Sequence, residues 1–233
     1  MVPFAVSVVL ALVVGLLAGS LLVALAVVVV VTGGGWLALR SRQDRLCLWS
    51  LGAAPAEEGS QARARNLIEG LCLSMGLKEP RLYVAEGRGA AVAVFGGGRE
   101  RGFLVVGDTL EQCCSRLEME ALLAHGLAHL RLGQGVAASR RAVSVGLVAL
   151  AWPGAQSRID NARRAAAESE ADLVAVGTTR FPPALHGALS TLAASAVEVT
   201  GSRRQALACH CWCSGACGQD VGLVARIESL SDL

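Results

Sequence analysis

The sequence predicts an α+β protein that is mostly helical, with a transmembrane helical hairpin at its N-terminus and a small β-sheet in the domain that follows. Three observations predict this class: an uncharged run over residues 1–39, helical spacing of apolar residues further on, and short β-branched runs between the helices. Hydrophobic residues make up 53% of the chain and charged residues 17%, which excludes a disordered protein. We expect an anchor over residues 1–39, a juxtamembrane linker over 40–60 and a folded domain over 61–233.

The N-terminal run is too long for one membrane span. As a single helix, residues 2–39 would extend about 57 Å, whereas a bilayer core is about 30 Å thick. Two spans joined near residues 18–20 fit that length, so we expect a hairpin; the alternative is one span over 21–39 behind a cleaved signal peptide. Residues 1–7 lack the basic start of such a peptide. By the positive-inside tendency, the basic residues after the run place the domain in the cytoplasm: Arg40, Arg42 and Arg45.

A linker turn, a helix and a sheet are predicted next. Gly, Pro and Ser over residues 51–60 predict the turn. The helix is indicated by apolar residues at helical spacing, and Gly76 lies near its C-terminus: Leu67, Ile68, Leu71, Cys72 and Met75. Strands are predicted at 81–85, 91–95 and 103–106, with a glycine-rich turn at 96–98.

Two longer helical regions complete the prediction. Asp108, with Glu111 three residues later, predicts a helix N-cap. The helical region that starts there is expected to reach about residue 134 and can contain one break. A second helix is predicted over residues 156–177. The apolar stretch 142–152 is too short to cross a bilayer, so we expect a buried helix there.

Two histidines mark the first helical region as a candidate metal site. His125 and His129 are four residues apart, so their rings project from one helix face and can reach a single zinc ion. The alternative is a pair of ordinary surface or core histidines. Apolar flanks predict that the pair is buried, where imidazoles without a partner would be costly.

The second helix offers a third ligand. Glu168 supplies a carboxylate, and Asp172 lies one turn later on the same face, where it can orient a ligating imidazole. The alternative is two carboxylates on a solvated face.

The segment 117–134 resembles the zinc-binding helix of the HtpX-type membrane metallopeptidases, a gluzincin family with the pattern H-E-x-x-H followed by E-x-x-A-D on a later helix. Segments 51–53, 80–84, 168–172, 179–183 and 226–230 resemble family features in the same order. The resemblance implies a Zn²⁺ cofactor, a metalloendopeptidase fold, peptide or unfolded protein segments as substrates, and a bacterial inner membrane location. It also implies that His210, shortly before 226–230, can stabilise an oxyanion.

One residue departs from the family pattern. Gly126 stands where the family has the general-base glutamate, and a glycine has no atom that can carry a proton. Losing such a group typically costs about 10²- to 10⁴-fold in rate. Neither Glu118 nor Glu120 is placed by helical geometry to substitute for it. The predicted function is therefore a zinc-binding peptidase relative with impaired catalysis. Glycine destabilises a helix by about 1 kcal/mol relative to alanine, so local stability does not explain its presence here.

Two other functions stay open at this level. One is an active zinc metalloendopeptidase in membrane protein quality control. The other is a redox or metal sensor built on clustered cysteines, although their spacing matches no standard zinc motif: Cys209, Cys211, Cys213 and Cys217. Nucleic acid is not an expected partner, because 21 basic and 19 acidic residues form no basic cluster.

Overall fold

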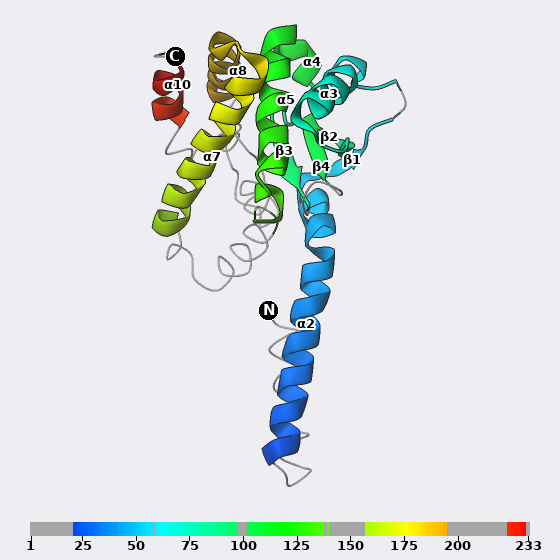
Figure 1. The fold of residues 1–233 in the computed structure, drawn as a ribbon. Helices are drawn as coiled ribbons and strands as arrows, with labels where there is room; N and C mark the ends of the chain where they lie inside the picture. The colour runs from blue at the N-terminus through cyan, green and yellow to red at the C-terminus, as the bar shows by residue number, and fades with distance from the viewer. Residues whose placement is uncertain are drawn as a thin grey trace.

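The computed structural model describes a group of helices packed beside one small sheet, with one long helix extending away from it (Figure 1). It describes residues 21–57, 59–96, 102–137, 139, 157–194 and 223–231. The elements in chain order are α2 (Leu21–Leu51), β1 (Ala53–Pro55), α3 (Ala62–Met75), β2 (Arg81–Ala85), β3 (Val92–Phe95), β4 (Phe103–Gly107), α4 (Leu110–Cys113), α5 (Arg116–Arg131), α7 (Ser157–Thr179), α8 (Pro182–Ala194) and α10 (Leu223–Ser231). The α+β class is confirmed.

The sheet has the order β1-β2-β4-β3 and mixes both strand orientations. Strands β2 and β4 are parallel, while β1 and β3 pair antiparallel with their neighbours. The three predicted strands are confirmed to within one residue. Strand β1 was missed, because the linker turn predicted over 51–60 contains it. Two alanines and a proline carry no β pattern of their own, and the strand forms because Ala53 pairs opposite Ala85 of β2.

Helix α5 lies at the centre of the fold. It packs against α7, α3, α8 and β3, and every residue from Ala121 to Leu130 is buried. The helix is apolar on almost all sides, which is typical of a helix enclosed by its own domain. Its two histidines are therefore held in the interior, as their apolar flanks predicted.

The predicted helical region is present, with its break: α4 begins at Leu110 and α5 at Arg116. Asp108 is not its N-cap, because Thr109 holds that position in α4. Helix α5 begins at a capping box: Ser115 accepts a hydrogen bond from the Glu118 amide, and Glu118 accepts one from the Ser115 amide. Asp108 accepts hydrogen bonds from the amides of Gly87 and Arg88, which lower its pKa although partial burial opposes the shift.

Glu111 caps a different helix from the one predicted. Its Oε1 accepts hydrogen bonds from the amides of Arg63 and Ala64, at 2.9 and 3.1 Å, in the first turn of α3. A carboxylate at a helix N-terminus satisfies amides that have no partner within the helix. At the other end of α3, Gly76 adopts a left-handed conformation (φ 65°), as predicted for its C-terminus.

Helix α2 extends away from the sheet, and its C-terminal end is built into the core (Figure 1). Cys47, Leu48 and Leu51 are buried there, whereas Leu22, Val30 and Leu37 are 63–78% exposed. The first predicted span lies outside the described residues. Of the helices that the structure describes, none has the length and apolar character required to cross a membrane, so the predicted hairpin is not supported.

Candidate metal centre

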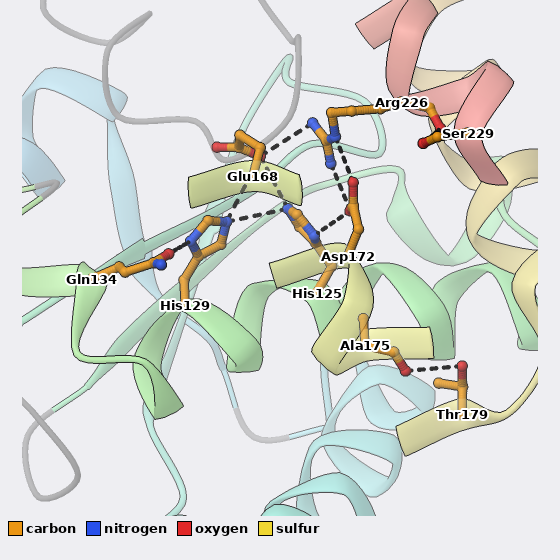
Figure 2. A network of polar contacts seen from close by, with 9 residues as sticks. All are labelled: His125, His129, Gln134, Glu168, Asp172, Ala175, Thr179, Arg226 and Ser229. Carbon is orange, nitrogen blue, oxygen red and sulfur yellow. Dashed lines mark hydrogen bonds and ion pairs between the residues drawn. The ribbon is translucent and has the colours of Figure 1, made fainter. Parts of the chain in front are cut away.

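Three of the predicted site residues converge between α5 and α7. His125 and His129 project from α5 toward Glu168 of α7, and all three are buried (Figure 2). Their ligand atoms lie within 4.8 Å of one another. This arrangement comes from the helical spacing that the sequence predicted, combined with the close packing of α7 on α5.

The separations fit a tetrahedral metal site. The two Nε2 atoms are 3.2 Å apart, and Glu168 Oε2 lies 3.2 Å from His125 Nε2 and 3.7 Å from His129 Nε2. Ligand atoms about 2.0–2.2 Å from a tetrahedral zinc ion are about 3.3–3.6 Å apart. The three atoms can therefore hold one small cation among them.

The other ring nitrogen of each histidine faces an oxygen. His125 Nδ1 lies 2.9 Å from Asp172 Oδ1, an ion-pair contact whose direction does not meet hydrogen-bond geometry. His129 Nδ1 lies 2.6 Å from Gln134 Oε1. When Nδ1 of a neutral imidazole carries the proton, Nε2 presents a lone pair. Two such lone pairs and a carboxylate oxygen face one another here, an arrangement that is repulsive unless positive charge lies between them.

Arg226 of α10 supplies part of the positive charge. Its guanidinium donates two hydrogen bonds to Asp172, at 2.6 and 2.8 Å, and one to Glu168 Oε2 at 3.2 Å (Figure 2). Two buried carboxylates against one buried guanidinium leave one negative charge uncompensated. A bound cation or a proton on an imidazole completes the balance, because isolated charge is expensive in the interior.

The titration behaviour of the cluster reflects the same charge balance. Burial opposes protonation of His125, but contacts with Asp172 and Glu168 outweigh it and hold the pKa of His125 above its ordinary value. Burial would raise the pKa of Glu168, yet its contacts with His125 and His129 hold that pKa well below the usual range. The pKa of Asp172 is lowered in the same way, against burial, by His125 and Arg226. The raised pKa favours a proton on His125 in the metal-free protein, in line with the negative charge of the two carboxylates.

Gly126 is explained by packing rather than by the site. A Cβ atom at this position would lie 2.9 Å from Val92 Cγ1 and 3.3 Å from atoms of Val94 and Leu104. Side chains of strands β3 and β4 therefore occupy the space beside the helix where a side chain would begin, so any other residue at this position requires these neighbours to shift. Sequence reasoning found no cause for this glycine, because the neighbours that require it lie more than 20 residues away.

Sequence reasoning also missed Arg226 and Gln134. Arg226 was noted only as part of a segment that resembles the family, and Gln134 only as the end of a predicted helix. Neither was assigned a role in the site. A buried carboxylate pair on α7 was the available signal, because it calls for a cation. Glu118 is engaged in the capping box of α5.

Several predicted elements fall outside the described residues. They include the oxyanion candidate His210, the cysteine cluster and the apolar stretch 142–152, so their roles stay predictions. The cysteines that the structure does describe are free, and burial raises the pKa values of two of them, Cys72 and Cys114, to about 11.

Comparison with known proteins agrees with the resemblance already noted. The chain is 27% identical over 115 residues to a protein named Protease HtpX homolog from Thermoanaerobacter pseudethanolicus, and 33% identical over 112 residues to one from Halobacterium salinarum. The chain is similar to HtpX proteases. The two matches cover 49% and 45% of this chain, but only 38% and 35% of those relatives, so it spans less than half of their length. No family model matches the sequence.

Proposed function

We propose that this chain is a zinc-binding relative of the HtpX proteases in which peptide hydrolysis is impaired. The observation that carries the proposal is the convergence of two imidazole Nε2 atoms and one carboxylate oxygen in a buried cluster, with both Nδ1 atoms facing oxygens. Nitrogen and oxygen ligands in this number are typical of zinc sites that keep one position open. The similarity to proteins named as proteases supports the same class of function.

This chain has residues for metal binding but lacks the residue for proton transfer. His125, His129 and Glu168 hold the metal, and when bound the zinc ion polarises a peptide carbonyl. Asp172 and Arg226 fix the orientation of His125 and Glu168. Gly126 cannot accept a proton from an attacking water or deliver one to the leaving amine, so proton transfer is the step that this chain performs poorly.

Two parts of the proposal concern partners. We propose peptide or unfolded protein segments as ligands of the retained site, on the basis of the similarity to proteases. We also propose that α2 attaches the chain to a bilayer, because its large apolar side chains Leu22, Val30 and Leu37 are exposed. Flotation of the full chain with phosphatidylglycerol-containing vesicles tests the attachment. Val30→Asp with Leu37→Asp should abolish flotation, and unchanged flotation of that variant would contradict it.

Metal content tests the proposed site directly. The full chain, purified in detergent and dialysed against buffered zinc, should contain one zinc ion per chain by elemental analysis. Glu168→Gln keeps the size of the side chain but removes its charge, and its content should fall to a small fraction. Circular dichroism of both proteins controls for folding. Equal metal content in the two proteins, or none in the natural chain, would refute the site.

Proteolysis tests the impairment separately. The zinc-loaded natural chain should leave casein intact at enzyme concentrations at which a metallopeptidase digests it. Glu168→Gln, assayed beside it, reports any contaminating protease. Turnover by the natural chain that a chelator abolishes and that Glu168→Gln lacks would show that proton transfer is intact.

A further inference from the structure

We propose that Gln134 and Glu170 are positioning residues that hold His129 in its metal-binding tautomer. The inference rests on the proposed zinc site and adds two residues to it. Gln134 lies just after α5 and contacts both His129 and Glu170 of α7. These contacts form a chain of three side chains that begins at the protein surface and ends at the metal site.

The donors and acceptors of this chain permit one arrangement. A carboxylate only accepts hydrogen bonds, so the atom of Gln134 that faces Glu170 at 2.9 Å must be its NH₂ group. The carbonyl oxygen of the same amide then faces His129 Nδ1 at 2.6 Å, so this nitrogen must carry the proton. The neutral ring is left with its lone pair on Nε2, which points toward His125 and Glu168.

The two histidines are therefore oriented by different means. Asp172 contacts Nδ1 of His125, and because both carboxylate oxygens are acceptors, rotation of that group does not change what the ring meets. Gln134 presents an acceptor to His129 in one amide orientation and a donor in the other. A donor facing Nδ1 would favour the tautomer with the proton on Nε2, and Nε2 would then have no lone pair for the metal. Glu170 prevents that rotation by accepting from the NH₂ group.

Metal affinity of Gln134→Leu provides the first test. Zinc affinity, measured by competition with a chromophoric chelator, should fall about 10- to 100-fold, as is usual when a ligating histidine loses its partner. Gln112→Leu is the matched control, because it makes the same substitution at an exposed position of α4. Its affinity should stay within about twofold of the natural chain. Equal affinities of the two variants would overturn the inference.

Glu170 gives a variant that leaves the core untouched, because its side chain is exposed. Glu170→Ala should weaken zinc binding about 2- to 5-fold, the scale of a solvent-exposed charged hydrogen bond. Adding Gln134→Glu to this variant should restore the affinity, because a carboxylate presents an acceptor to Nδ1 in either orientation. The double variant has the same net charge as the natural chain. Failure of Gln134→Glu to improve on Glu170→Ala would overturn the inference.

The tautomer of His129 is a readout that a change of charge alone would not alter. In the metal-free natural chain, nitrogen NMR should show the neutral His129 ring protonated at Nδ1. Glu170→Ala should give a mixture of tautomers, and the double variant should return the ring to one. A natural chain that binds zinc while His129 shows a mixture would refute the positioning role alone. A natural chain that binds no zinc would refute the proposed function instead.

Discussion

Two neighbouring sides of helix α5, one with the candidate metal ligands and one with Gly126, are built differently. The side that carries His125 and His129 faces charged and polar groups of α7 and α10. The side that carries Gly126 faces the apolar side chains of Val92 and Val94 in β3. A metal can be held on the first side, while on the second side apolar packing fills the place where a proton carrier would begin. The candidate metal ligands and the glycine beside them therefore depend on separate packing contacts of α5.

The largest expected effect comes from placing a carboxylate on the side of α5 that carries Gly126. Gly126→Glu combined with Val92→Ala should raise cleavage of casein by about 10²- to 10⁴-fold over the natural chain, the range assigned to a positioned acid or base. Gly126→Glu alone should gain less, because Val92 Cγ1 lies 2.9 Å from the new Cβ.

The matched control for that variant is Gly126→Gln with Val92→Ala. It has the same size and relieves the same contact, but its amide does not titrate. Cleavage should therefore stay at the level of the natural chain. If the glutamine form cleaved as fast as the glutamate form, space rather than proton transfer would limit the natural chain.

Removal of the buried guanidinium on the charged side of α5 should lower the free energy of unfolding. Arg226→Leu leaves Glu168 and Asp172 without their guanidinium partner in the interior. The free energy of unfolding in urea, measured with chelator present, should fall by about 3–5 kcal/mol, the scale of a buried pair that loses one member. The exposed Arg116→Leu is the control and should change it by less than about 0.5 kcal/mol. A similar small change for both would mean that the network contributes little.

Local patterns predicted the ligands, whereas the residues that support them depend on packing between distant segments. His125 and His129 are one helical turn apart, and Glu168 and Asp172 are too, so spacing alone placed each pair on one face. Arg226 lies 54 residues beyond Asp172, and no local pattern connects them. The strands β2 to β4 were similarly predicted from β-branched runs. The cap at Asp108 failed because its partners, Gly87 and Arg88, lie about 20 residues earlier.

The packing of Gly126 can be measured without any chemistry. Gly126→Ala should lower the free energy of unfolding by about 1–3 kcal/mol, as overpacking a core usually does. Gly70→Ala is the matched control: it lies in helix α3 with no atom within 4 Å of the new Cβ, so it should instead stabilise by about 1 kcal/mol. Adding Val92→Ala should recover part of the loss at position 126. Stabilisation by Gly126→Ala would show that the sheet shifts to accommodate a side chain. The side of α5 that carries Gly126 would then be less tightly packed than we argue.

The smallest expected effect lies away from both sides of α5. Asp108 accepts hydrogen bonds from Gly87 and Arg88, which hold its pKa below its ordinary value of 3.8. The unfolded chain therefore binds the proton first as the pH falls, so the stabilisation is complete above about pH 5 and is lost as the pH falls through the folded-state pKa. Asp108→Ala should lower the free energy of unfolding at pH 7 by about 0.5–1.5 kcal/mol. That difference should shrink in acid, and a difference that stayed constant down to pH 2 would assign the effect to packing.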